Sequence, residues 1–369
     1  MTSVTIPAAV LEHAGAVARD VADLAGVAVD ATELLTGRAA LLNLPAPGRI
    51  SAGGATRLLQ GADGWCALTL SRPDDVDAVP ALVEADRVDD AWTAVEQRAR
   101  EIGVTAFAQR ARLLGLPVGV HGEAAARPPA VTRLGERAQV DVADALVVDL
   151  SSMWAGPLCG ALLARAGATV VKVETAARPD GTRLGPRVFF DWINGGKLSY
   201  RADLHHPEPL QALLRAADVV IESSRPDALR RRGLGPHQVP ARPGRIWLRV
   251  TGHGTEASHA DRVAFGDDAA VAGGLTTGPA DAPSFCGDAI ADPLTGLHAA
   301  QAVLAAARRG GGELIDIAMA AVAAGYAHLS QEDPTSARAA PQIHRAAADL
   351  GADNATVDRI VAQRSGVAC

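Results

Sequence analysis

Asp292 is the acidic side chain whose sequence position best suits covalent chemistry. It directly precedes Pro293 and an apolar stretch over residues 294–307 that predicts a helix. The first turn of a helix has free backbone N–H groups and the positive end of the helix dipole, so a carboxylate there stays ionised. An ionised, oriented carboxylate can attack a thioester carbonyl. The alternative is an ordinary helix start, with Asp292 as the N-cap and Pro293 at the first helical position.

Two further features could contribute to such chemistry. Asp267 and Asp268 form a second acidic element that could supply a general acid or base. The Gly156-Pro157 pair begins a predicted helix, where a glycine and a helix N-terminus allow close approach of the backbone to a ligand. Each has a structural alternative: Asp268 as the N-cap of a helix over 269–272, and Gly156 as part of a plain turn between a strand and a helix.

A sheet must position these residues, because the second half of the chain alternates apolar strands with helices. Residues 146–150 and 169–174 are continuous apolar strands around a helix that ends at residue 165, which makes one βαβ unit. Further strands are expected at 219–221, 246–251 and 314–317, and further helices at 207–216, 293–308 and 318–330. The pattern predicts an α/β fold with a Rossmann-like, mostly parallel sheet flanked by helices.

The first half of the chain predicts a smaller α+β domain. A Pro/Gly-rich loop at 45–54 separates two N-terminal helices from a hairpin of strands at 55–60 and 65–70. The helices of this half are expected at 8–28, 31–43, 77–86, 87–101 and 104–114. We therefore divide the chain into a helical N-terminal segment at 1–47, the small α+β domain at 48–125, a linker at 126–143, and a Rossmann-like domain with C-terminal helices at 144–369.

The composition disfavours several classes of protein. The 369 residues are 48% apolar and 21% charged, with a net charge of −7, which suits a globular chain and argues against a nucleic-acid partner. The four cysteines are widely spaced and match no zinc-ligand pattern, so no metal site is expected. We see no signal peptide and no apolar run of membrane-spanning length, so we expect a cytoplasmic protein without a membrane partner.

Seven sequence blocks in the second half carry a resemblance to a known family. They are VVDLSSMWAGPLCGALLARAGATVVKVE (147–174), GGKLSYRADL (195–204), ADVVIESSRPDALRRRGLG (217–235), RIWLRVTGHG (245–254), FGDDAAVAGGL (265–275), DAIADPLTGLHAAQAVLAA (288–306) and GGELIDIAMAAV (311–322). In content and order they resemble the family III CoA-transferases, which include formyl-CoA transferase, carnitine-CoA transferase and α-methylacyl-CoA racemase.

The resemblance assigns a catalytic role to two aspartates. Asp292 matches the catalytic aspartate of the family. Asp268 matches an acidic position common in the family, where it would orient the substrate or Asp292. Asp267 stands where the racemase branch has a histidine that acts as acid or base, so this resemblance weakens the racemase interpretation; we group Asp267 with the residues that border the coenzyme.

The resemblance also implies a binding site for coenzyme A. The loop formed by Met153, Trp154, Ala155 and Gly156 matches the segment that borders the pantetheine and the thioester. Arg178 lies near the family's adenosine or phosphate contact. Arg225 also matches a CoA contact, and its guanidinium suits a pair of phosphate oxygens. A salt bridge within the loop is the alternative for Arg225.

The N-terminal half resembles the family in a different order. Residues 48–75 and 112–120 resemble parts of the family's small domain, which normally follows the sheet and here precedes it. Residues 343–364 resemble the closing helices of the family. We therefore expect a rearranged version of the architecture, which is physically possible because domains fold as units with their termini at the surface.

The function implied by the resemblance is an acyl-CoA:carboxylate CoA-transferase that works through an aspartyl anhydride and an aspartyl-CoA thioester. The implied partners are acyl-CoA and a small carboxylic acid, with coenzyme A as a substrate, no permanently bound cofactor, and a homodimer as the assembly. Two alternatives stay open. One is an acyl-CoA racemase, epimerase or dehydratase with an aspartate acid/base pair. The other is a non-catalytic homologue, which the rearranged order motivates.

Overall fold

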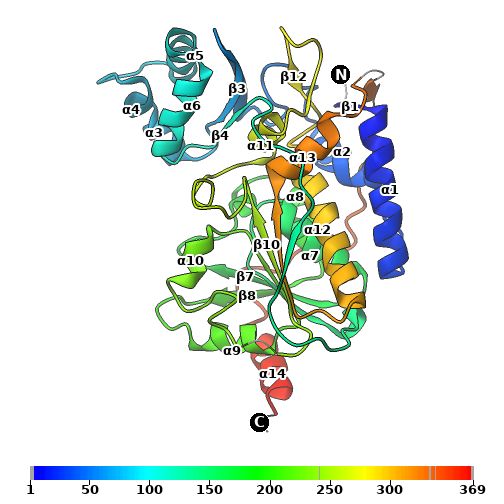
Figure 1. Cartoon of the computed structure of the whole chain (residues 1–369). Helices are drawn as coiled ribbons and strands as arrows, with labels where there is room; N and C mark the ends of the chain where they lie inside the picture. The colour runs from blue at the N-terminus through cyan, green and yellow to red at the C-terminus, as the bar shows by residue number, and fades with distance from the viewer. Residues whose placement is uncertain (1–3, 241, 332–333, 337, 367–369) are drawn as a thin grey trace.

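The computed structural model describes residues 4–366, apart from 241, 332–333 and 337. Its large sheet has the strand order β5-β13-β10-β9-β6-β7-β8 (Figure 1). Neighbouring strands are parallel except β5, which runs antiparallel to β13 at the edge. The strands are β5 (Ala130–Arg133), β6 (Leu146–Asp149), β7 (Thr169–Thr175), β8 (Leu198–Ala202), β9 (Val219–Glu222), β10 (Ile246–Thr251) and β13 (Glu313–Ala318).

The strand order reverses at β6, near the middle of the sheet. The chain leaves β6 through α7 (Ala155–Arg165) to reach β7 on one side, and β9 lies on the other side of β6, after α9 (Glu208–Ala216). In open parallel sheets, ligands bind at such a reversal, in the crevice outside the carboxyl ends of the strands. The loop that follows β6 is therefore the place in this fold where a ligand is expected.

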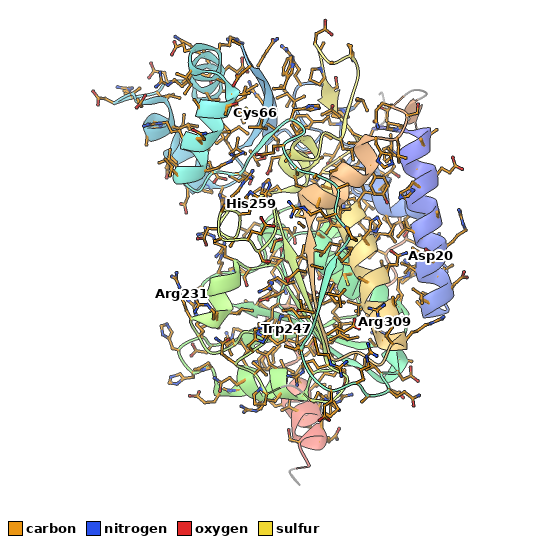
Figure 2. The ribbon with its side chains drawn as sticks, in the orientation of Figure 1. Asp20, Cys66, Arg231, Trp247, His259 and Arg309 are labelled. Atoms are coloured by element: carbon orange, nitrogen blue, oxygen red, sulfur yellow. The ribbon has the colours of Figure 1, made fainter. Side chains whose placement is uncertain are left out.

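Helices cover both faces of the sheet, so the strands are buried on both sides and consist of continuous apolar residues. On one face, Val147 and Leu248 pack with α1, α2, α7, α12 and α13. On the other face, Val148 and Trp247 pack with α9 and α14, and Trp247 lies in the middle of the sheet (Figure 2). The helices not yet given bounds are α1 (Ala8–Ala25), α2 (Ala31–Leu42), α12 (Ala291–Arg308), α13 (Met319–Ala327) and α14 (Asn354–Arg364).

A smaller antiparallel sheet, β2-β3-β4, lies at one end of the molecule with its own apolar core around Leu68 and Phe107 (Figure 1). It contacts the rest of the chain through α11, and a Cβ atom at Gly119 on β4 would overlap the α11 backbone. The elements of this region are β2 (Thr56–Gly61), β3 (Gly64–Thr69), α3 (Pro73–Asp77), α4 (Val79–Val83), α5 (Ala91–Ile102), α6 (Val104–Leu113), β4 (Val118–Val120) and α11 (Gly266–Ala272).

The remaining elements are short. They are β1 (Thr5–Pro7), which pairs with β14 (Pro334–Ser336), β11 (Thr276–Thr277), which pairs with β12 (Ser284–Phe285), α8 (Arg187–Asn194), α10 (Pro226–Arg230), and two 3-10 turns, η1 (Val142–Asp144) and η2 (Gly181–Leu184). Within the described residues, no helix combines the length and the apolar character that a membrane span requires.

The structure confirms the predicted α/β class and the mostly parallel sheet, and it differs from the sequence-based expectations in several places, among them the unexpected strand β8. The segment at 126–143, expected as a linker, supplies the edge strand β5. The N-terminal helices α1 and α2 join the apolar core of the large sheet. The helix expected at 77–86 is shorter, covering only α4 at 79–83, and the separate helix α3 precedes it. In the stretch 343–364, only the part from Asn354 onward is helical.

Candidate active site

Asp292 lies inside the first turn of α12 and does not cap that helix. The helix begins at Ala291, with Ile290 as an N-cap that makes no side-chain hydrogen bond, so the alternative interpretation of Asp292 as the N-cap is wrong. The backbone N–H of Asp292 donates to the carbonyl of Ala289 at 2.9 Å. The carboxylate therefore does not cap α12, and it faces the starts of α7 and α11 instead.

Two glycines let the surrounding backbone approach Asp292 closely. A Cβ atom at Gly266, the first residue of α11, would overlap one carboxylate oxygen of Asp292 and the carbonyl of Ala289. A Cβ atom at Gly296 on α12 would lie 2.7 Å from the carbonyl of Ala155, the first residue of α7. The N-terminal ends of α7, α11 and α12 therefore meet around the Asp292 side chain.

The pKa of Asp292 is raised to about 7, mainly because burial removes the carboxylate from water. The positive charge of Arg38 and hydrogen bonds from the backbone of Gly266 and Ala155 oppose this rise, whereas the like charge of Asp267 adds to it. Burial therefore opposes the ionisation of Asp292 that the helix terminus favours. Near neutral pH this carboxyl group is divided between its two protonation states.

Two buried carboxyl groups, Asp267 and Asp288, belong to the segments next to Asp292. Asp267 accepts a hydrogen bond from the backbone N–H of Ala289 at 3.0 Å, and burial raises its pKa to about 6. Asp288 accepts one from Arg38 at 2.7 Å, while its second oxygen is buried without a hydrogen-bond partner among the described residues. Burial also raises the pKa of Asp288. The sequence-based analysis identified neither Arg38 nor Asp288 as site residues.

Two of the four non-glycine residues with positive φ among the described residues lie in loops near this cluster. Met153, before α7, has φ of 73°, and Ala289, before α12, has φ of 44°. Side-chain-bearing residues rarely adopt the left-handed region, and surrounding contacts must hold them there. Here Asp267 binds the N–H of Ala289, and Asp180 accepts the N–H of Met153 at 3.2 Å. Such strain is typical of functional sites.

A network of buried ion pairs supports the loop after β6. Lys197 donates to Asp149 at 2.9 Å and to the carbonyl of Pro157 at 2.7 Å. Lys172 donates to Asp180 at 2.7 Å, and Asp180 in turn accepts the N–H of Met153. These bonds hold the loop at both of its ends: at the end of β6 and at the start of α7.

The cations of this network reverse the effect of burial on its carboxylates. Burial alone would raise the pKa of Asp149, but Lys197 and Lys172 lower it below the ordinary value. Burial likewise opposes ionisation of Asp180, and Lys172 again lowers its pKa. Asp149 and Asp180 therefore stay ionised. This suits a structural role in holding the loop after β6 better than a role in the reaction.

The predicted loop residues lie together at the carboxyl ends of the central strands. Trp154 is buried and makes edge-on ring contacts with Phe189 and Trp192, at centroid distances of 5.3 and 6.2 Å. Its indole nitrogen is buried without a hydrogen-bond partner among the described residues. Met153 is 36% exposed and Ala155 is buried, so the loop has an accessible side and an anchored side.

Arg178 and Arg225 are exposed on the loops that flank this one. Arg178 follows β7 and Arg225 follows β9, the two strands beside β6. The N–H of Ser152 donates to Ser223 at 3.2 Å, which joins the loops after β6 and β9. The structure thus places one predicted arginine on each side of the Met153–Gly156 loop. Their contact with coenzyme A stays a prediction.

Asp268 is directed at the smaller sheet. One of its oxygens accepts hydrogen bonds from Thr69 on β3 at 2.8 Å and from the N–H of Phe265 at 2.9 Å. Burial raises its pKa to about 8. These contacts explain Asp268 as part of the start of α11 and of its junction with the smaller sheet, and a catalytic role stays a prediction.

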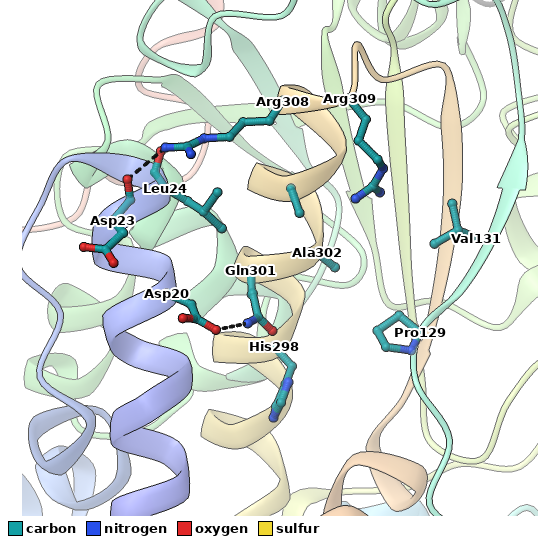
Figure 3. Close-up of a pocket in the computed structure, with 11 residues that line it drawn as sticks. Asp20, Asp23, Leu24, Pro129, Val131, His298, Gln301, Ala302, Arg308 and Arg309 are labelled. Atoms are coloured by element: carbon teal, nitrogen blue, oxygen red, sulfur yellow. Dashed lines mark hydrogen bonds between the residues drawn. The ribbon is translucent and has the colours of Figure 1, made fainter.

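A separate cavity of about 480 Å³ lies between α1, α12 and the approach to β5 (Figure 3). Asp20 and Gln301 form a hydrogen bond of 2.9 Å in its wall, and His298 lies beside them. None of the predicted site residues lines this cavity. His298 pairs with the hydroxyl of Tyr326 at 2.9 Å, as expected for a structural histidine, and burial lowers its pKa to about 4.

The sequence profile of CoA-transferase family III matches residues 142–357, from the 3-10 turn before β6 to the last helix. This match covers more than half of the chain, so the protein belongs to CoA-transferase family III. The matched region contains every predicted site residue, whereas Arg38 lies outside it.

Individual relatives match about half of the chain. It is 35% identical over 193 residues to a succinyl-CoA–D-citramalate CoA-transferase of Chloroflexus aurantiacus, which is 47% of this chain and 48% of that protein. It is 36% identical over 198 residues to a probable fatty acyl-CoA transferase of Mycobacterium tuberculosis, covering 48% and 50%. With a succinate–glutarate CoA-transferase of Agrobacterium fabrum, identity is 34% over 199 residues, covering 47% and 49%.

The chain thus spans about half the length of the curated relatives it matches. Among solved structures, a CaiB/BaiF family protein from Brucella suis is 30% identical and covers 51% of this chain and 55% of that one, with a TM-score of 0.45. The order of the segments at 1–141 relative to the family stays a prediction.

Proposed function

We propose that the protein is an acyl-CoA:carboxylate CoA-transferase in which Asp292 is the nucleophile. The observation that carries this proposal is the Asp292 carboxylate, set where the N-terminal ends of α7, α11 and α12 meet, with a pKa raised to about 7. A more basic, partly desolvated carboxylate is a better nucleophile than an ordinary one once it is ionised. Membership of CoA-transferase family III supports the reaction class.

The reaction proceeds by four acyl transfers that need no water and no redox step. Asp292 attacks the donor acyl-CoA, forming a mixed anhydride and releasing CoA thiolate. The thiolate attacks the aspartyl carbonyl, which gives an enzyme-bound CoA thioester and releases the donor acid. The acceptor carboxylate attacks this thioester to form a second anhydride and CoA thiolate, and the thiolate then attacks the acceptor acyl carbonyl. The products are the acceptor acyl-CoA and a regenerated Asp292 carboxylate.

The backbone around Asp292 suits the intermediates of this sequence. The N–H groups of Ala155 and Gly266 face the carboxylate and would also stabilise the oxyanion that forms on the aspartyl carbonyl. The accessible side of the Met153 loop would receive the pantetheine. Arg178 and Arg225, on the flanking loops, would bind phosphate groups of coenzyme A. A cytoplasmic homodimer acting on a small carboxylic acid completes the proposal.

The test is CoA exchange between an acyl-CoA and a free acid, measured for Asp292→Asn beside the wild type. We expect the variant to lose at least about a thousandfold in kcat, with an unchanged circular dichroism spectrum. Asp281→Asn, at an exposed position, is the matched control and should keep full activity. Substantial exchange by Asp292→Asn would overturn the assignment.

A second candidate function uses the same carboxyl groups as an acid/base pair. The charge of Asp267 raises the pKa of Asp292, and the pKa values of about 6 and about 7 for the two groups suit proton transfer near neutral pH. Racemisation or dehydration of an acyl-CoA would then incorporate solvent deuterium in the absence of an acceptor acid. Deuterium uptake without CoA exchange would favour this function over transfer.

A further inference from the structure

Arg38 on α2 lies where three parts of the candidate site meet. Its guanidinium donates to Asp288 at 2.7 Å and lies 5.7 Å from the ring centre of Trp154 and 5.5 Å from that of Phe189. A Cβ atom at Gly53 would lie 3.2 Å from its second terminal nitrogen. One side chain from the N-terminal helices thus touches the aromatic wall beside α7, the loop before β2 and the turn before α12.

The turn before α12 is held at two points, and Arg38 provides one of them. Asp288 is 1% exposed and is bonded by Arg38, while the next residue, Ala289, is strained and is bonded by Asp267. The carbonyl of Ala289 then accepts the N–H of Asp292. The position of the Asp292 side chain therefore depends on these two anchors.

Arg38 also supplies positive charge to a cluster of three carboxyl groups, of which Asp267 and Asp288 are buried. The charged groups that act on Asp292 are Arg38 from α2 and Asp267 from α11, and the turn adds Asp288, which acts on Asp267. Arg38 lowers the pKa of each of the three carboxyl groups against the effect of burial. Its side chain is 23% exposed, so water screens its charge only in part.

We propose that Arg38 is a positioning residue for Asp292: it fixes the turn that carries the nucleophile and supplies the positive charge that favours the ionised carboxylate. This inference rests on the proposed function, in which Asp292 must be ionised to attack the thioester. It adds a side chain from outside the matched family region to the catalytic machinery.

The experiment follows the titration of Asp292 in the free, full-length protein by NMR of ¹³C-labelled aspartate carboxyl groups, with Asp292→Asn used to assign the signal. In Arg38→Gln we expect the titration midpoint of Asp292 to rise by about one pH unit, because a nearby opposite charge shifts a pKa by about 1–3 units. The acid limb of the pH–rate profile for CoA exchange should move in the same direction.

Arg309→Gln is the matched control. Arg309 lies at the far end of α12 (Figure 2) and forms an ion pair with Glu313 of the same 2.7 Å length. Its replacement should leave the Asp292 midpoint unchanged. An Arg38→Gln midpoint equal to that of the wild type would overturn the proposal.

If Arg38→Gln does not fold, Asp288→Asn tests the effect of Arg38 on Asp292 instead. Asp288 accepts a hydrogen bond from Arg38 at 2.7 Å and so shares its positive charge. Its neutralisation should therefore lower the Asp292 midpoint through Arg38, and an unchanged midpoint would count against the proposal. Absence of CoA exchange by the wild type at every pH would instead overturn the proposed function, and the titration would still test Arg38.

Discussion

Two groups of buried carboxylates lie close to the same loop, and they are built in opposite ways. The paired carboxylates, Asp149 and Asp180, each have a buried lysine as partner, at 2.9 and 2.7 Å. The open carboxylates, Asp267, Asp288 and Asp292, share the single guanidinium of Arg38. Asp149 and Asp180 are fully buried, whereas Asp292 keeps some exposure to solvent, and the supply of positive charge also differs between the groups.

This difference in positive charge distinguishes carboxylates with a structural role from carboxylates that can take part in a reaction. Lysine partners lower the pKa of the paired carboxylates, so these groups stay charged and hold the backbone of the loop after β6. The open carboxylates have raised pKa values because burial outweighs one shared cation, so Asp267 and Asp292 exchange protons near neutral pH. A buried carboxyl group that titrates near neutrality is a candidate for function, whereas a fully paired one is a candidate for structure.

Removing a lysine from the paired group should give the largest loss of stability. Lys172→Met leaves Asp180 buried without its cation, and we expect the free energy of unfolding to fall by about 3–5 kcal/mol, as measured by urea denaturation. The double variant Lys172→Met/Asp180→Asn should recover much of this loss because no buried charge is left unpaired. If Lys172→Met were as stable as the wild type, the paired carboxylates would not need their lysine partners, and the contrast with the open carboxylates would fail.

A methyl group at Gly266 should disturb the open group through packing alone. Gly266→Ala places a Cβ atom against Asp292 and the Ala289 carbonyl, so we expect a stability loss of about 1–3 kcal/mol and a reduced kcat for CoA exchange. Gly325→Ala is the matched control, because a Cβ atom there meets nothing within 4 Å and its φ is ordinary. Equal behaviour of the two variants would show that close approach at Gly266 is unimportant.

The two groups should also respond to pH with opposite signs. Asp292 binds its proton more tightly in the folded chain than in the unfolded one, so its effect on stability is most favourable below pH 4 and is lost as pH rises through about 7. Asp180 has a lowered pKa, so its contribution is present above its ordinary pKa and is lost as pH falls through the folded value.

Neutral replacements should reveal these signs. At pH 8, Asp292→Asn should be more stable than the wild type by about 1–2 kcal/mol, with little difference at pH 5, whereas Asp180→Asn should be less stable at pH 8. Chemical denaturation at both pH values measures the four differences. If Asp292→Asn were instead less stable than the wild type at pH 8, the fold would stabilise the ionised Asp292 carboxylate rather than destabilise it.

The exposed cations should contribute the smallest effects. Arg178→Gln and Arg225→Gln should each weaken binding of free coenzyme A by about three- to tenfold, since a solvent-exposed charge contact contributes about 1 kcal/mol. Calorimetry at low and high salt would measure this, and the difference should shrink at high salt. Arg187→Gln, on an exposed arginine of α8, is a suitable control. Unchanged affinity in both variants would exclude these loops as phosphate contacts.

The sequence predicted the parts of this molecule that depend on local pattern. Continuous apolar runs identified β6, β7, β9, β10 and β13, because strands buried on both faces need them. The edge strand β5 was missed because all of its residues are exposed and its pairing with β13 depends on distant chain. Asp292 was identified from its position next to an apolar helix. The sequence did not predict that Asp292 lies inside the first turn of that helix.

The cluster around Asp292 could not be predicted to the same extent. Arg38 lies on a helix about 250 residues away from Asp288 in the chain, and only the fold brings them together. The visible signal was an isolated arginine in an apolar helical stretch, Leu34 to Leu42, which has many structural explanations. The raised pKa of Asp292 also depends on burial by α7 and α11, which no local pattern records.

The most direct test is mass spectrometry of the peptide that contains Asp292 after incubation of the whole protein with acyl-CoA at pH 8. A covalent adduct with the mass of coenzyme A, attached to Asp292, released by hydroxylamine and absent from Asp292→Asn, is the predicted result. CoA exchange that continues while this peptide stays unmodified, or while another residue bears the adduct, would contradict the account.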